Sequence, residues 1–229
     1  MSHVDLKAAA GRAAAALVED GMALGFGTGS TTAAALEALA VRVREEGLRV
    51  TGVPTSYAAE RLARKLGLPL TTLDETPRLD LALDGADEVD PDLNLIKGRG
   101  AAMTRERIVA AEAERFVVLV DDSKRVARLG TKMPVPVEVV PQATPTVIRR
   151  LKALGAQAAV CEGSGKDGPV VTDQGLWVVD ARFDGGLDDA ARTAAEIKAM
   201  PGVLDHGLFI GLATEVIVAT EGGIEHVRQ

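Results

Sequence analysis

The stretch between residues 84 and 108 gathers acids, cations and glycines at spacings that could support proton transfer. Residues 79–83 alternate polar and apolar side chains, which predicts a strand, so Asp84 and Asp87 would follow its carboxyl end. Ligands of open α/β sheets bind beyond the carboxyl ends of the strands, where two acids could exchange protons with a substrate. The alternative is an ordinary solvated turn around Gly85.

A lysine and a glutamate stand on either side of the next glycine turn. Lys97 directly precedes Gly98-Arg99-Gly100, where small residues let a ligand approach the backbone closely. The lysine could stabilise a developing oxyanion there, or it could simply lie on the surface. Thr104 could cap a helix whose dipole keeps Glu106 ionised. A glutamate in a first helical turn is also common for structural reasons. The combination, rather than any single residue, therefore points to catalysis.

Residues 90–94 match the beginning of a calcium loop. Leu95 stands where that loop needs glycine, and Ala101 stands where it needs a bidentate glutamate. We therefore expect no metal ion here and interpret Asp90 and its neighbours as loop residues. The three histidines are too scattered in the sequence to predict a zinc site or a Ser-His-Asp triad.

A second glycine-rich turn, residues 25–32, lies between a predicted strand and a predicted helix. Its backbone N–H groups and hydroxyls would form a phosphate cradle from Thr28, Gly29, Ser30 and Thr31. Neither the dinucleotide-binding pattern G-x-G-x-x-G nor the Gly-Lys-Ser/Thr loop of nucleoside triphosphatases occurs here. The sequence thus favours a small phosphorylated ligand, with a tight structural turn as the alternative.

Two lysines outside this turn could reach the same ligand. Lys7 falls in a predicted helix, residues 6–17, and could contact a phosphate or only water. Lys124 follows the buried strand pattern of residues 116–120, whose carboxyl end would share the sheet edge with Asp84 and Thr28.

Composition excludes several classes of partner. A net charge of −7 disfavours nucleic acid and anionic membranes, and 3% aromatic residues leave no platform for stacking bases. A single cysteine, Cys161, fits a reducing compartment, and we interpret it as structural. The first residues lack a signal pattern and no apolar run reaches membrane-spanning length, so we expect a cytoplasmic, soluble protein.

The order of elements predicts an α/β fold with two parts. Alternating strands and helices over residues 1–130 indicate a Rossmann-like, mainly parallel sheet with helices on both faces. The proline-rich residues 133–141 suggest a linker into an edge strand. Residues 131–205 then follow the strand–helix–strand–strand–helix–strand order of a small ferredoxin-like α+β domain. Short strands in residues 206–229 would return to the first domain.

Four motifs together resemble the type A ribose-5-phosphate isomerases, and the similarity covers essentially the whole chain. They are Gly27-Thr28-Gly29-Ser30-Thr31, Asp84-Gly85-Ala86-Asp87, Lys97-Gly98-Arg99-Gly100 with Thr104-Arg105-Glu106, and Asp122-Ser123-Lys124. The resemblance implies interconversion of ribose 5-phosphate and ribulose 5-phosphate, a step of the pentose phosphate pathway, by a homodimer or homotetramer without metal or cofactor.

The resemblance also implies residue roles. Glu106 would be the catalytic base, and Asp84, Asp87 and Lys97 would act at the substrate, while residues 28–31 and Lys124 would contact the ligand. Two alternatives remain at this point. A sugar-phosphate sensor would bind without turnover, although no segment is left over for a DNA-binding module. A transferase would form a covalent adduct, for which Glu106 could serve.

Overall fold

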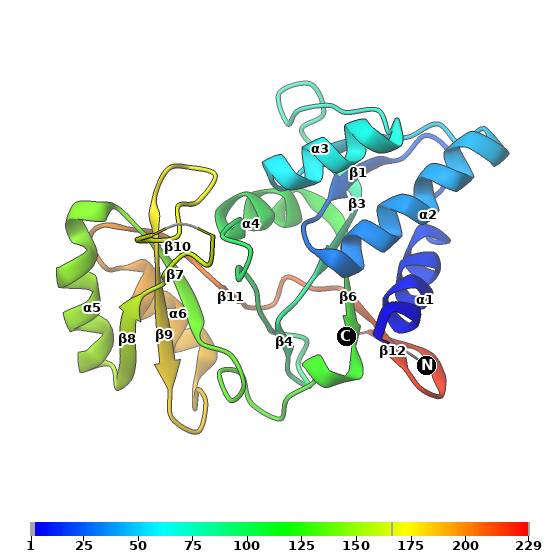
Figure 1. Ribbon diagram of the computed structural model, residues 1–229. Coiled ribbons are helices and arrows are strands. Elements are labelled where there is room, and N and C mark those ends of the chain that lie inside the picture. The colour runs from blue at the N-terminus through cyan, green and yellow to red at the C-terminus, as the bar shows by residue number, and fades with distance from the viewer. Residues whose placement is uncertain (1–2, 166, 229) are drawn as a thin grey trace. The chain divides into compact units, whose positions relative to one another are not determined.

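The computed structural model describes residues 3–165 and 167–228, and the chain divides into two compact units. Unit 1 comprises the residues up to Ala86, residues 105–125 and the residues from Gly211 onward. Unit 2 comprises residues 87–104 and 126–210. In Figure 1 the colour shows that unit 1 combines the blue and cyan N-terminal part of the chain, the green α4 and β6, and the red C-terminal part, so it includes both ends of the sequence.

Unit 1 is built on a six-stranded sheet in the order β13-β12-β6-β3-β1-β2. Neighbouring strands are parallel except for the antiparallel edge strand β13. The strands are β1 (Ala23–Phe26), β2 (Thr51–Pro54), β3 (Leu79–Gly85), β6 (Ala113–Asp121), β12 (Glu215–Thr220) and β13 (Gly223–Arg228). This mainly parallel sheet confirms the predicted fold class.

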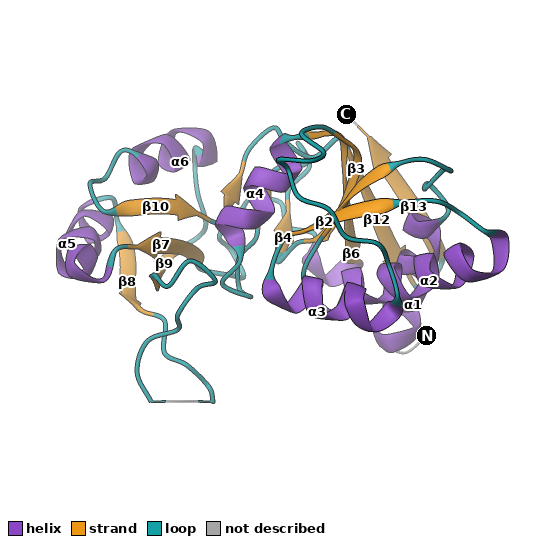
Figure 2. Cartoon of the chain, turned by 90° about the horizontal axis from the view of Figure 1, so that it is seen from above, coloured by secondary structure: helices purple, strands orange, loops and turns teal. Residues whose placement is uncertain are grey.

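Helices cover both faces of this sheet, as predicted (Figure 2). The helices are α1 (His3–Ala15), α2 (Ser30–Glu46), α3 (Tyr57–Leu66) and α4 (Met103–Ala111). On one face, Leu24 and Phe26 pack into an aliphatic core with Leu36 of α2. On the other face α4 approaches so closely that a Cβ on Gly25 would lie 2.6 Å from Val109 Cγ1. Glycine at this position therefore permits direct helix–strand packing.

Unit 2 contains the predicted ferredoxin-like arrangement. Its elements are β7 (Val135–Val139), the 3₁₀ turn η2 (Pro141–Ala143), α5 (Thr144–Ala153), β8 (Ala156–Val160), β9 (Trp177–Phe183), α6 (Ala190–Lys198) and β10 (Val203–His206). The strands pair antiparallel in the order β10-β7-β9-β8. Val137 and Val179 pack with Leu151 of α5 and Ile197 of α6, so both helices share one core with the sheet.

A small three-stranded sheet completes unit 2, in the order β11-β5-β4. It pairs β5 (Leu95–Ile96) with β4 (Glu88–Val89) and with β11 (Leu208–Phe209). This pairing ties residues 87–104 and the residues up to Ile210 to unit 2, whereas the sequence boundaries placed them with the first domain. The reason is long-range strand pairing, which a local pattern does not contain.

Three predictions about strands were wrong. The local sequence pattern predicts short strands at residues 69–73 and 170–172, but neither forms, because only the single bridges Gly52–Leu70 and Val171–Trp177 occur there. The predicted edge strand in residues 133–141 is β7, which lies between β10 and β9 and is buried along its length. Its pairing with β10 is irregular between Val203 and Asp205, opposite Val139 and Glu138, while Pro136 pairs with Asp180 of β9. Within the residues described, no helix is long and apolar enough to cross a membrane.

Candidate active site

The predicted ligand residues of unit 1 lie at the carboxyl edge of its parallel sheet. β6, β3 and β1 are consecutive neighbours, and each ends in one of the candidate segments. Thr28 follows β1, Asp84 lies near the end of β3, and Lys124 closes the 3₁₀ turn η1 (Asp122–Lys124) after β6. Parallel strands end at one edge, so the fold brings these segments to the same side of unit 1, as expected.

Asp84 is fixed by the glycine turn that follows β1. Its side chain is buried, and its Oδ1 accepts hydrogen bonds from the backbone N–H groups of Thr28 at 3.0 Å and Gly85 at 2.7 Å. A Cβ on Gly27 would lie 2.5 Å from the carboxyl carbon of Asp84, far inside contact distance. Gly27 is therefore required for this carboxylate to reach its place.

The turn opens directly into α2 as an anion-binding helix start. α2 begins at Ser30 after Gly29, whose φ is 109°, and no described side chain caps it or places an acid in its first turn. Thr31 lies in this first turn. Lys7 of α1 donates a hydrogen bond from Nζ to Ser30 Oγ at 2.8 Å. An uncapped helix start with a lysine beside it favours an anion such as phosphate.

Two hydroxyls that the sequence analysis missed complete this turn. Thr28 Oγ1 donates to Ser56 Oγ at 2.6 Å and lies 2.8 Å from Thr55 Oγ1. Both partners are buried, at the end of β2 and at the N-cap of α3. Only their position after a predicted strand end could have indicated them, because Pro-Thr-Ser is an ordinary sequence for a strand-to-helix turn.

The remaining loop residues belong to unit 2. Lys97 is 2% exposed, and its backbone N–H donates to Gly207 O at 2.9 Å. Its Nζ lies 5.6 Å from the ring centroid of Phe209, a residue that the sequence analysis did not identify. Asp87 Oδ2 accepts the Arg99 N–H at 3.3 Å. The structure thus brings Asp87 and the turn after Lys97 together, while the Arg99 side chain is exposed.

The glycines of this turn are not equivalent. Gly98 has φ 102°, and a Cβ there would lie 2.8 Å from Met103 Cε, so both backbone conformation and space require glycine. Gly100 is exposed, and its backbone conformation does not require glycine, since its φ is not in the positive range. The turn therefore has one strictly required glycine beside Lys97.

Glu106 lies in the first turn of α4, as predicted, and is only 4% exposed. The prediction that Thr104 caps this helix was wrong. α4 begins one residue earlier, at Met103, and the Thr104 hydroxyl donates instead to the carboxylate of Glu138 in β7. The hydroxyl thus donates to a distant carboxylate instead of accepting a backbone N–H of its own helix.

The alternative interpretation of the acidic loop as solvated fails at Glu88. Its side chain is fully buried and accepts three backbone N–H groups, from Gly130 and Lys132 at 2.6 Å and from Met133 at 2.7 Å. Asp90, by contrast, stabilises its own loop by accepting the Asn94 N–H at 2.8 Å. No set of three or more His, Cys, Asp or Glu side chains in the described ranges could hold a metal ion.

Cys161 fits its structural interpretation. Burial, with the nearby Asp180 carboxylate as the next cause, raises the pKa of the thiol to about 11. The thiol is therefore protonated near neutral pH and is a poor nucleophile.

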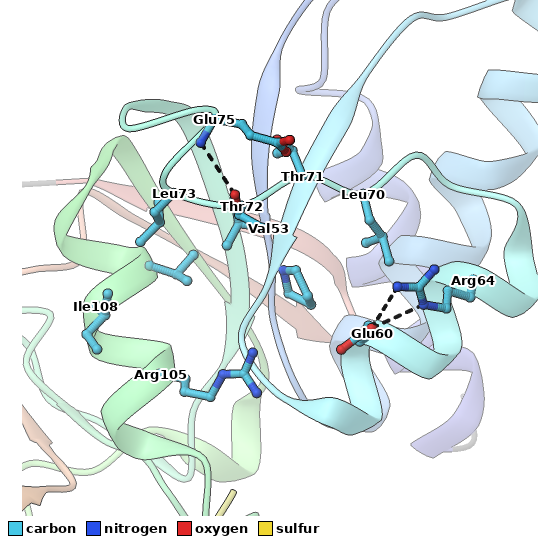
Figure 3. A pocket seen from close by; sticks show the side chains of 12 residues that line it. Val53, Glu60, Arg64, Leu70, Thr71, Thr72, Leu73, Glu75, Arg105 and Ile108 are labelled. Atoms are coloured by element: carbon cyan, nitrogen blue, oxygen red, sulfur yellow. Dashed lines mark hydrogen bonds and ion pairs between the residues drawn. The ribbon is translucent and has the colours of Figure 1, made fainter. Parts of the chain in front are cut away.

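Unit 1 also has a pocket of about 420 Å³ that none of the predicted site residues lines (Figure 3). Arg105, next to Glu106 in α4, lines it together with the ion-paired Glu60 and Arg64 of α3. The Arg105 guanidinium lies 4.9 Å from the ring centroid of Tyr57. Arg105 and Glu106 thus have different surroundings although they are adjacent in the helix.

A parallel sheet with an uncapped helix start, a lysine and a buried carboxylate at its carboxyl edge is typical of α/β enzymes of phosphorylated metabolites. The model of the family "Ribose 5-phosphate isomerase A (phosphoriboisomerase A)" matches residues 51–223. The chain belongs to this family.

Individual relatives agree along the whole length. Ribose-5-phosphate isomerase A of Synechococcus sp. is 50% identical over 226 residues, which cover 98% of this chain and 97% of the relative. That of Pyrococcus abyssi is 45% identical over 100% of both chains. The isomerase structure from Methanocaldococcus jannaschii superposes with a TM-score of 0.95 at 45% identity and full coverage of both chains. A D-ribose-5-phosphate isomerase in complex with phospho-erythronic acid gives 0.97 at 43%, again with full coverage.

Proposed function

We propose that this ribose-5-phosphate isomerase interconverts D-ribose 5-phosphate and D-ribulose 5-phosphate through an enediolate, with Glu106 as the base. Moving the carbonyl from C1 to C2 requires a base to take the proton from C2 and return it to C1. One carboxylate can perform both transfers. The observation that carries the proposal is the burial of Glu106 in the first turn of α4, where the helix dipole favours its ionised form.

Lys97 and the N–H groups of the following turn would stabilise the enediolate oxygen. A buried ammonium is worth more than a solvated one, because little water screens its charge. Asp84 or Asp87 would assist ring opening and the transfer of a hydroxyl proton. Asp84 is supported by its fixed position beside the glycine turn, and Asp87 by its place next to the Arg99 N–H.

The phosphate would occupy the cradle of residues 28–31, with Lys7 and Lys124 as cationic partners and residues 85 and 86 along the sugar. The uncapped start of α2 and the Lys7–Ser30 hydrogen bond support this placement. Binding the remote phosphate supplies energy that orients the reacting carbons. The phospho-erythronic acid bound by one relative is a sugar acid phosphate, which fits the same ligand class.

The experiment follows ribose 5-phosphate turnover by chelator-treated protein in deuterated water, with the product observed directly by NMR. We expect turnover with deuterium entering C1 or C2, and Glu106→Gln should lose about a thousandfold or more of it while still binding substrate. The exposed Glu112 just after α4 provides a matched control, because Glu112→Gln should keep full activity.

Two outcomes would change the assignment. Activity retained in Glu106→Gln would remove this residue from the role of base. Saturable binding of the sugar phosphate by the wild type without turnover would favour the sensor.

A cytoplasmic homodimer or homotetramer without cofactor completes the proposal. The acidic composition and the single cysteine support the location, and the family resemblance supports the assembly. Sedimentation equilibrium at several protein concentrations would distinguish dimer from tetramer, and a monomer at all concentrations would contradict both.

A further inference from the structure

Glu138 is a fully buried carboxylate in the middle of β7, outside the predicted site. Its Oε2 accepts a hydrogen bond from the Thr104 hydroxyl. Its other oxygen, Oε1, is also buried and has no hydrogen-bond partner among the residues that the structure describes. Among the described residues, the Thr104 hydroxyl is thus the one group that donates a hydrogen bond to the Glu138 carboxylate.

Such a carboxylate is costly to the fold. Burial of an acid with one hydrogen bond loses more hydration than it regains, and an apolar side chain of similar volume would stabilise a sheet core better. The neighbours of Glu138 in the strand, Val137 and Val139, are apolar and fully buried. A purely structural role therefore explains Glu138 poorly, and its hydrogen bond with Thr104 suggests another role.

Glu138 holds the start of α4. Thr104 is the second residue of this helix, and Met103 before it is fully buried and so close to Gly98 that a Cβ there would lie 2.8 Å from Met103 Cε. Residues 103 and 104 belong to unit 2, whereas the helix from Arg105 onward belongs to unit 1. The first turn of α4 is therefore anchored by packing at Met103 and by a directional hydrogen bond at Thr104.

We propose that Glu138 is a positioning residue for the catalytic base. By accepting the Thr104 hydroxyl it fixes the rotation and the axial position of the first turn of α4, and hence the direction of the Glu106 carboxylate two residues later. The packing of Met103 alone restricts the helix start less, because apolar contacts are not directional. This inference rests on the role of Glu106 proposed above.

The test removes the hydrogen bond and then restores it. Thr104→Val keeps the shape but lacks the donor, and it should lower kcat about tenfold or more with little change in KM, because misplacement by a fraction of an ångström is costly to a proton transfer. Thr104→Ser retains the hydroxyl and should recover most of the lost activity. Glu138→Leu removes the acceptor and should lower kcat by a similar factor.

Thr144 provides the matched control. It is a buried threonine in the first turn of another helix of unit 2, α5, and its hydroxyl has no hydrogen-bond partner among the described residues. Thr144→Val should leave kcat and KM unchanged. If Thr144→Val lowers kcat as much as Thr104→Val, the effect is one of general packing and the proposal is wrong.

A double-mutant cycle separates positioning from loss of folding. The Thr104→Val/Glu138→Leu pair should lose no more kcat than either single variant, since both remove the same hydrogen bond. Additive losses, or kcat unchanged in correctly folded single variants, would overturn the proposal. Glu106→Gln measured in parallel keeps the two hypotheses apart: if it is active, the role of Glu106 fails whatever the cycle gives.

Discussion

The ammonium of Lys97 lies 5.6 Å from the ring centroid of Phe209. Phe209 is in β11, which pairs with β5, the strand directly before Lys97. Lys97 follows β5 and Phe209 pairs with Leu95, so the two side chains fall on the same face of the small sheet. Both residues are almost fully buried. The aromatic ring thus gives the cation a partner in a place where little water reaches it.

We therefore predict that Phe209→Leu lowers kcat several-fold, since a desolvated cation–π contact is worth roughly 1–2 kcal/mol and the ammonium would lose its fixed position. Steady-state kinetics on ribose 5-phosphate measures this. Phe116 in unit 1 is equally buried, and Phe116→Leu serves as the control, which should lower stability without changing kcat. Equal kcat in both variants would show that the ring does not act through Lys97.

Gly27 gives a second prediction. A Cβ at this position would lie 2.5 Å from the carboxyl carbon of Asp84 and 2.3 Å from Leu83 O, so Gly27→Ala must displace the carboxylate or the turn. We expect at least about a hundredfold loss of kcat/KM. Gly222→Ala is the control, because the nearest atom to its added Cβ lies at 3.7 Å. Full activity of Gly27→Ala would mean that Asp84 need not be where the structure has it.

Lys7 gives a prediction about substrate binding. If Lys7 holds the phosphate beside Ser30, Lys7→Met should raise KM about tenfold or more, with a smaller effect on kcat, because the lost contact is remote from the reacting carbons. The difference in KM between the wild type and Lys7→Met should shrink as salt is added, since salt screens an electrostatic contact. Lys65→Met, in the last turn of α3, is the matched control and should leave KM unchanged. An unchanged KM in Lys7→Met would show that Lys7 does not contact the phosphate.

Glu215 gives a prediction about pH. Burial raises its pKa, but hydrogen bonds with His226, Arg228 and Arg115 outweigh burial and lower the pKa below its ordinary value of 4.5. A carboxyl with a lowered pKa in the folded state stabilises the fold above its unfolded pKa, and this contribution disappears as the pH falls through the folded pKa. The cluster therefore stabilises the fold near neutral pH, and the loss of this contribution adds to destabilisation by acid.

Glu215→Gln should thus be less stable than the wild type near neutral pH, and the difference should shrink on acidification. Urea unfolding at several values from about pH 7 down to about pH 3.5 measures it. Glu221→Gln, at an exposed position in the same hairpin, should show no such trend. A difference that is constant with pH would contradict the assignment to the Glu215 carboxylate.

The sequence by itself determined the class of fold and most of the candidate site. Alternation of strand and helix patterns is local, so the parallel sheet and the ferredoxin-like order could be predicted from periodicity. The motifs around Thr28, Asp84, Lys97 and Glu106 could also be recognised, because each is a run of neighbouring residues whose turn chemistry depends on glycines within the same run.

Only the tertiary structure decided which distant side chains complete these motifs. Thr28 and Ser56 are 28 residues apart, and Thr104 and Glu138 are 34 apart, so no local pattern pairs them. The burial of Glu88 likewise depends on N–H groups more than 40 residues away, which is why it resembled a solvated loop residue in the sequence. Hydrogen bonds and burial depend on proximity in space, and that proximity comes from packing of the whole chain.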